Sequence, residues 1–143
     1  MTKIDFYVLP EDGSMTVEVA IGRLAEKACA RGHHVFIQTG DEQETQRLDE
    51  ALWHFRPSSF VPHARSADAS SVERVIVGHE DPPLEYSDVL IKRSNGVPEC
   101  FARFERLAEI VTHDHTAIAA SREAWRFYRD RGYPLAKHEL QTA

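Results

Sequence analysis

Apolar residues recur along the chain at two spacings, and each spacing predicts a different kind of element. Short runs rich in β-branched and aromatic residues predict buried strands at 4–9, 34–39, 74–79 and 88–91. Apolar positions three and four residues apart predict helices over 15–31, 41–55 and 116–131. The segment 107–111 fits either a last central strand or the end of a helix, and Phe101 and Phe104 fit a short helical turn.

Capping and turn residues mark the ends of these elements. Asp41, followed three residues later by Glu44, is a capping-box pattern at the start of the second helix. Gly32 and Gly132 follow the first and last helices, where glycine commonly ends a helix. The segment 56–71 is rich in Pro, Ser, Ala and His without periodicity, which predicts an irregular connection. Strands that alternate with helices imply parallel pairing through right-handed crossovers, so the pattern predicts an α/β protein.

Length and composition narrow the class of protein. With 143 residues, 42% hydrophobic and 28% charged, the chain is expected to form one domain over 1–143. No apolar run approaches the roughly 20 residues that cross a bilayer, and the first residues lack a secretory signal, so we expect a cytoplasmic protein. Cys29 and Cys100 are far apart and form no Cys-x-x-Cys motif, which favours buried free thiols over a disulfide or zinc site.

The charge is unevenly distributed, and this bears on the kind of partner. A formal net charge of −6 disfavours general DNA binding, because affinity for DNA is built from Lys and Arg contacts to phosphates. The segment 122–137 nevertheless holds five basic residues against two acids. An acidic body with one basic helix suits an anionic peptide or protein tail better than a duplex.

Two histidine-containing clusters raise the question of metal binding or catalysis. His113-Asp114-His115 has metal-ligand types but no third strong ligand at a recognisable spacing, and a surface turn that caps the last helix is the alternative. The acids of His79, Glu80 and Asp81 follow a strand, where open α/β sheets hold catalytic groups, so a small hydrolase or nucleotide-processing enzyme is an alternative interpretation. No nucleophile and no glycine-rich phosphate loop accompany them. We therefore expect no catalytic site, no metal and no cofactor.

The final predicted helix carries a regular face of arginine and large apolar side chains. Ile118, Arg122, Trp125 and Arg129 recur at i, i+4, i+7 and i+11, with Arg126 beside them. One interpretation is a solvated face with an amphipathic anchor. The other is a recognition face, in which guanidinium groups bind carboxylates and the indole lines an apolar pocket for an acidic peptide with an aromatic end.

Large apolar residues also continue past the second helix into a proline-containing segment. Trp53 fits either the core or an interface, because Leu48 and Leu52 define a buried stripe close to it. Phe60 lies between Pro57 and Pro62, and an aromatic side chain in a stiffened loop is an efficient interface anchor.

Two strings, Arg47-Leu48-Asp49-Glu50-Ala51-Leu52-Trp53 and Phe60-Val61-Pro62-His63, resemble the chi subunit family of bacterial DNA polymerase III. The resemblance extends in order to 5–9, to 88–91 and to Arg122-x-x-Trp125-x-x-Tyr128, and it covers most of the chain. It implies a three-layer Rossmann-like α/β fold, with a mostly parallel central sheet and helices on both faces. It also implies a non-catalytic accessory role in DNA replication, within an assembly that has DNA-directed DNA polymerase activity.

The resemblance further implies two docking surfaces. One binds the psi subunit of the clamp loader in a 1:1 complex, with a helicase as an alternative partner, and its matching positions are Trp53, Phe60, Val61 and Pro62. The other binds the acidic, phenylalanine-terminated tail of single-stranded-DNA-binding protein, and its matching positions are Val111, Ile118, Arg122, Trp125, Arg126, Tyr128, Arg129 and Gly132. The family pattern has a lysine one turn before the arginine, where this chain has Ile118. Arg126 and Arg129 are the expected substitutes for that charge.

Overall fold

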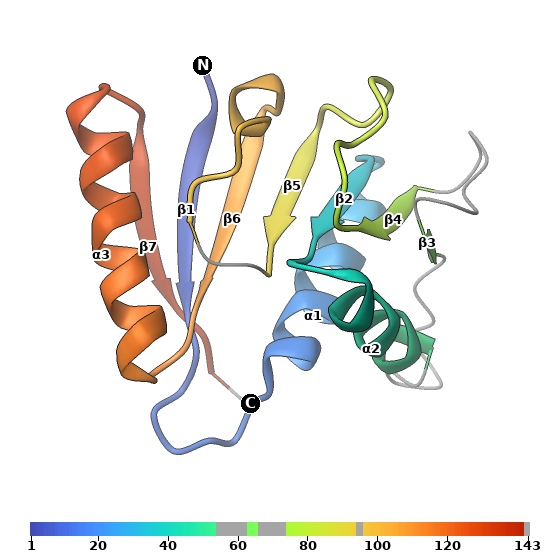
Figure 1. Cartoon of the computed structure of the whole chain (residues 1–143), viewed down its shortest axis with the longest axis horizontal. Coiled ribbons are helices and arrows are strands. Elements are labelled where there is room, and N and C mark those ends of the chain that lie inside the picture. Colours follow the sequence, from blue (N-terminus) through green and yellow to red (C-terminus); the bar gives the residue numbers. More distant parts are fainter. Residues whose placement is uncertain (54–62, 66–73, 94–95, 142–143) are drawn as a thin grey trace.

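The computed structural model describes residues 1–53, 63–65, 74–93 and 96–141; of Trp53 and 63–65 it describes the backbone. Within this part of the chain, seven strands form one sheet in the order β3-β4-β2-β5-β6-β1-β7 (Figure 1). All adjacent strands are parallel. The strands are β1 (Lys3–Val8), β2 (Val35–Gln38), β3 (His63–Arg65), β4 (Val75–Gly78), β5 (Val89–Lys92), β6 (Arg106–Val111) and β7 (Leu135–Glu139).

The helices begin where side chains cap their first turns. They are α1 (Val17–Ala30), α2 (Glu42–Trp53) and α3 (His115–Asp130), with a short 3-10 turn at η2 (Phe101–Arg103). Before α2, the Asp41 carboxylate accepts a hydrogen bond from the Glu44 N–H at 2.8 Å, and Glu44 accepts one from the Gly40 N–H at 3.0 Å. Asp41 thus caps α2 as predicted, whereas Glu44 binds the N–H of the residue before the cap, which is a variant of the capping box. Gly32 and Gly132 follow α1 and α3 with φ near +80°, a conformation that glycine adopts without strain.

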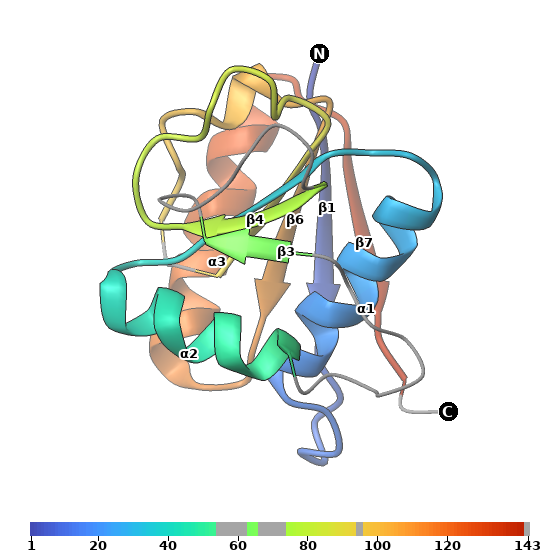
Figure 2. The ribbon, with the colours of Figure 1, turned by 90° about the vertical axis from the view of Figure 1, so that its right-hand side faces the viewer.

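The sheet separates two apolar layers, because successive side chains of a strand point to opposite faces. The layer under α1 and α2 contains Ile21, Leu48 and Leu52, together with alternate residues of β2 and β4, which are Val35, Ile37, Val75 and Val77. The layer under α3 contains Phe6, Phe36, Leu90 and Tyr128. Figure 2 shows α1 and α3 on opposite sides of the strands. The predicted three-layer α/β fold with a parallel sheet is therefore confirmed.

Two strands were not predicted from the sequence, and one open choice is now decided. The segment 107–111 belongs to β6, a central strand between β5 and β1. The segment 56–71, predicted as an irregular connection, contains β3, so that prediction was wrong for 63–65. The stretch after Gly132 forms β7, which pairs with β1 at the edge of the sheet. Both additional strands lie at the edges of the sheet, where a strand pairs with one neighbour only. An edge strand is less enclosed than a central one, so it does not need a long apolar run.

Candidate functional site

An open groove of about 260 Å³ lies between α3 and the sheet, and we call it the α3 groove. It is lined by Phe6, Val8, Val111, Thr112, His113, Ile118, Ser121, Arg122, Trp125 and Lys137. The lining comes from α3, from the strands β1, β6 and β7, and from the loop between β6 and α3. The groove therefore exists only because segments that are far apart in the sequence fold together.

One wall of the groove is a single face of α3. Ile118, Arg122 and Trp125 are four and three residues apart, so they lie one above the other on the helix. Ala124 and Tyr128 on the neighbouring face are buried against the sheet and fix the rotation of the helix. The sequence pattern thus correctly predicted that these three residues share a face.

The floor of the groove is apolar and belongs to the sheet. Val8 pairs with Val111 across β1 and β6, so both side chains point to the same face. Phe6 is buried on that face, and its ring centroid lies 5.0 Å from that of Trp125 at an angle of 58°. This tilted contact holds the half-buried indole at the edge of the groove, where Phe6 of the sheet packs against it.

Two cationic side chains stand at the groove. Arg122 is exposed and forms no ion pair with any carboxylate in the described ranges. Lys137 pairs with Phe6 in the register of β7 and β1, so its side chain lies on the same face of the sheet and reaches the groove from β7. Its ammonium lies 3.9 Å from the Glu139 carboxylate, but both side chains are more than half exposed, so this pair is weak. Both cations are thus available to an anionic ligand.

The loop at one end of the groove is held by hydrogen bonds to helix and strand. The Asp114 carboxylate accepts hydrogen bonds from the Ala117 N–H and the Thr112 hydroxyl, both at 3.0 Å. These bonds hold the pKa of Asp114 below its ordinary value. The His113 ring shares a 2.6 Å hydrogen bond with the Leu9 carbonyl. The sequence alternative that His113-Asp114-His115 is a turn capping the last helix agrees with this geometry, and no group of metal ligands occurs among the described residues.

Four residues assigned to the tail-binding surface do not line the α3 groove. Tyr128 is fully buried, and its hydroxyl donates a 2.7 Å hydrogen bond to Glu109, which in turn pairs with the Lys92 ammonium at 2.6 Å. Burial and the Glu109 charge raise the pKa of Tyr128. Arg129 binds the adjacent Asp130, Arg126 is exposed and does not line the groove, and Gly132 follows α3. Neither arginine lines the α3 groove beside Ile118.

Sequence reasoning missed six residues that line the groove, and all but Ser121 lie outside α3. The missed residues are Phe6, Val8, Thr112, His113, Ser121 and Lys137. Ser121 could have been predicted from the sequence, because it lies three residues after Ile118 on the same helical face. Lys137 was counted in the basic segment, but only the pairing of β7 with β1 places it beside Phe6.

The residues expected to bind psi are largely outside the described part of the chain. Phe60, Val61 and Pro62 lie outside it, and Trp53 is described only as the last residue of α2. The alternative catalytic cluster is described. His79 lies 3.6 Å from a Glu42 carboxylate oxygen and 3.9 Å from one of Glu80, and the Glu80 side chain is 84% exposed. Such solvated carboxylates lack the enclosed setting of a general acid or base.

Fold and groove together define the class: a small α/β protein with a parallel sheet and an open, apolar groove that is edged by two cations. A family model, DNA polymerase III chi subunit, HolC, matches residues 1–136. The DNA polymerase III subunit chi of Pseudomonas aeruginosa is 40% identical over 141 residues, which cover 98% of each chain. Those of Haemophilus influenzae and Escherichia coli are 29% and 28% identical, over at least 94% of each chain.

The chain belongs to the DNA polymerase III chi subunit family. It is thus a subunit of a polymerase assembly with an accessory role in DNA replication, as the sequence resemblance implied. None of the described helices is long and apolar enough to cross a membrane.

Proposed function

We propose that this subunit is an adaptor, which binds the psi subunit of the clamp loader with one surface and the acidic tail of single-stranded-DNA-binding protein with the α3 groove. The observation that carries the proposal is the combination, in one groove, of an apolar floor with two cations from different elements, Arg122 of α3 and Lys137 of β7. An adaptor of this kind links the polymerase assembly to coated single strands, so each contact gains from effective concentration.

The chemistry of the groove suits a peptide that ends in phenylalanine and carries acidic residues before it. The terminal aromatic ring displaces water from Val8, Val111 and Trp125, while the α-carboxylate receives hydrogen bonds from the Arg122 fork. Because a guanidinium binds a carboxylate through two parallel hydrogen bonds, Arg122 also fixes the direction of the peptide end. Neither the apolar floor nor the cations alone would select for both features.

Lys137 provides the second charge in this proposal. The family pattern places a lysine at the position of Ile118, and here Ile118 extends the apolar wall instead. Lys137 reaches the same groove from β7, so an acidic side chain of the peptide has a partner on the sheet side. Arg122 and Lys137 then clamp the peptide from two sides.

Titration of the purified chain with a synthetic acidic peptide ending in phenylalanine tests this proposal. Arg122→Ala should weaken binding by about 30-fold or more, which corresponds to about 2 kcal/mol or more for loss of a desolvated charge pair. Calorimetry gives the affinity, and the fluorescence of Trp125 reports occupancy of the groove. Replacing the terminal phenylalanine of the peptide by alanine should reduce binding to a comparable extent.

The matched control is Arg126→Ala, which removes the same charge from an exposed position of α3 outside the groove. This variant should bind the peptide within about twofold of the parent chain, since exposed charges outside a contact contribute little. Equal losses in both variants would show that the peptide senses only the general charge of the helix, and the groove assignment would be wrong.

The psi surface is proposed from the family resemblance, through Phe60 and its neighbours Val61 and Pro62. Truncation of a central aromatic anchor commonly costs 2 kcal/mol or more, so Phe60→Ala should weaken the complex with psi by roughly 30-fold. Co-elution of the two subunits in gel filtration at low micromolar concentration measures this. The same variant should retain full affinity for the tail peptide, and undiminished co-elution with psi would remove Phe60 from that interface.

A further inference from the structure

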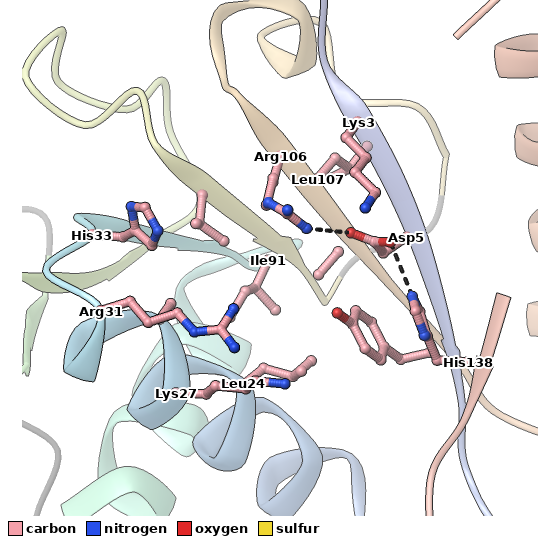
Figure 3. Close-up of a pocket in the computed structure, with 14 residues that line it drawn as sticks. Lys3, Asp5, Leu24, Lys27, Arg31, His33, Ile91, Arg106, Leu107 and His138 are labelled. Carbon is pink, nitrogen blue, oxygen red and sulfur yellow. Dashed lines mark hydrogen bonds and ion pairs between the residues drawn. The ribbon is translucent and has the colours of Figure 1, made fainter. Parts of the chain in front are cut away.

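A second pocket, of about 190 Å³, lies on the face of the sheet opposite the α3 groove, and we call it the basic pocket (Figure 3). Its floor contains Tyr7, Val89 and Ile91, and the carboxyl-terminal half of α1 covers one side of it. Because Tyr7 alternates with Phe6 and Val8 along β1, the two sites cannot share side chains of that strand. The basic pocket is thus separate from the groove assigned to the tail peptide.

The basic side chains of this pocket come from several separate elements. They are Lys3, Lys27, Arg31, His33, Arg106 and His138. Figure 3 shows Lys27 and Arg31 extending from the side of α1, while Arg106 enters from β6 and Lys3 from β1. The four Lys and Arg side chains belong to exposed residues of a chain whose net charge is −6.

One carboxylate faces these cations within the lining, and it is already occupied. Asp5 is 3% exposed, and its oxygens lie 3.0 Å from the His138 ring and 3.4 Å from the Arg106 guanidinium. Lys3, Lys27 and Arg31 form no ion pair with any carboxylate in the described ranges. The pocket therefore has an excess of positive charge that the described part of the chain does not neutralise.

Tyr7 contributes a partly buried hydroxyl to the lining of the basic pocket. Burial raises the pKa of Tyr7 and the Asp5 carboxylate raises it further, while Arg106 and Arg31 act in the opposite direction. The hydroxyl thus lies within electrostatic range of cations from both β6 and α1. The Tyr7 ring stacks on the His138 ring at 4.8 Å and 19°, which fixes its position. Its O–H makes no hydrogen bond to a described residue, so it can donate one to a ligand.

Helix stabilisation explains only part of this arrangement. Lys27 and Arg31 lie at the carboxyl end of α1, where cations interact favourably with the helix dipole. Lys3 and Arg106, however, belong to strands and gain nothing from that dipole. Three unpaired cations, Lys3, Lys27 and Arg31, share the lining with Arg106 and Tyr7. Together they match the several oxygens and the multiple charges of a phosphate or pyrophosphate group.

We infer that the basic pocket binds the polyphosphate group of a small phosphorylated molecule, either free pyrophosphate or the phosphate chain of a nucleotide. The pocket volume is below the roughly 300 Å³ at which sites for whole drug-sized ligands begin. The phosphates therefore fill the pocket, and any nucleoside attached to them lies mainly outside, against the open edge. Lys27 and Arg31 contact the anion from α1, and the Tyr7 hydroxyl donates a hydrogen bond from below.

Calorimetric titrations of the full chain at low salt test the inference, with inorganic pyrophosphate, deoxythymidine triphosphate and thymidine as probes. Pyrophosphate and the triphosphate should bind, and thymidine should not. Equal affinities would identify the pocket as a pyrophosphate site, whereas a triphosphate that binds at least tenfold more tightly would identify a nucleotide as the ligand. The double variant Lys27→Gln with Arg31→Gln should lose at least tenfold in affinity for both anions.

The control is the double variant Arg126→Gln with Arg129→Gln, which removes the same charge from the exposed face of α3. It should bind both anions within about twofold of the parent chain. Equal losses in the two double variants, binding of thymidine alone, or binding only of a single-stranded oligonucleotide would each overturn the inference. Peptide binding to the α3 groove should be unchanged by Lys27→Gln with Arg31→Gln, so failure here is separable from failure of the proposed adaptor function.

Discussion

At the scale of single residues, Asp114 connects the stability of α3 with the shape of the groove. Its carboxylate caps the first turn of the helix and also holds the Thr112 hydroxyl, and Thr112 lines the groove. An uncapped helix start leaves N–H groups without partners and permits the first turn to fray. The Asp114 side chain therefore holds the groove-lining Thr112 in position relative to the first turn of α3.

Asp114→Ala should lower the melting temperature at pH 7, whereas Asp114→Asn should retain most of the stability, because an amide oxygen still accepts from the Ala117 N–H. The lowered pKa of Asp114 sets the pH dependence. Its stabilisation is present in full above the ordinary value of 3.8 and is lost as the pH falls through the lowered folded-state pKa.

Thermal unfolding of the parent chain and of Asp114→Asn between about pH 2.5 and 7 measures this difference. The difference between the two proteins should shrink in the acid range and be constant near neutrality. A constant difference at every pH would mean that the charge of Asp114 contributes nothing.

At the scale of elements, a buried polar network ties three of them together. The Lys92 ammonium of β5 pairs with Glu109 of β6 at 2.6 Å, and the Tyr128 hydroxyl of α3 donates to the other Glu109 oxygen at 2.7 Å. Both charged side chains are about 95% buried or more. The network sets the register of β5 against β6 and the height of α3 above them, and so it positions the wall of the groove.

Lys92→Met should destabilise the fold by about 3–5 kcal/mol, because it leaves the buried Glu109 carboxylate without its cation. Urea unfolding measures this loss, with Lys137→Met as the exposed control, expected within about 0.5 kcal/mol of the parent. Adding Glu109→Gln to Lys92→Met should recover much of the stability, since an amide remains an acceptor for Tyr128 without the charge. No recovery would show that packing, rather than charge, accounts for the loss.

The elements also show what sequence patterns could and could not predict. The central strands are continuous apolar runs because both of their faces are covered, and such runs can be predicted as strands from the sequence. The edge strand β7, with the sequence Leu-Ala-Lys-His-Glu, has no such run, since its stability comes from pairing with β1. The helical spacing predicted the wall formed by Ile118, Arg122 and Trp125. The floor and Lys137 depend on strand register, which a single sequence does not reveal.

At the scale of the whole molecule, an acidic protein carries two separate cationic sites on opposite faces of one sheet. The net charge of −6 repels anions at long range, yet salt at 0.1 M screens charges beyond about 10 Å. An anionic ligand in the groove therefore interacts more strongly with Arg122 and Lys137 than with the distant acidic residues. This arrangement favours anions near the two cationic sites, and it is consistent with the proposed adaptor role and with little general affinity for DNA.

Tail-peptide affinity should fall by on the order of tenfold when sodium chloride is raised from about 50 to about 500 mM, because the groove cations are exposed and screened. Fluorescence titration at several salt concentrations gives the slope. Arg122→Ala should have a shallower slope than the parent chain, as one charge contact is missing. An affinity that rises with salt would mean that repulsion by the acidic body outweighs attraction at the groove.

The position of β7 has a consequence for how the protein behaves at high concentration. A strand at the rim of a sheet exposes unpaired backbone groups that can recruit another molecule, and sheet proteins commonly protect this rim with charged side chains. Lys137, His138 and Glu139 occupy it here, and all three are exposed. The lysine that lines the groove thus also protects the sheet edge from pairing with another molecule, so in the proposed function this short segment serves both ligand binding and resistance to aggregation.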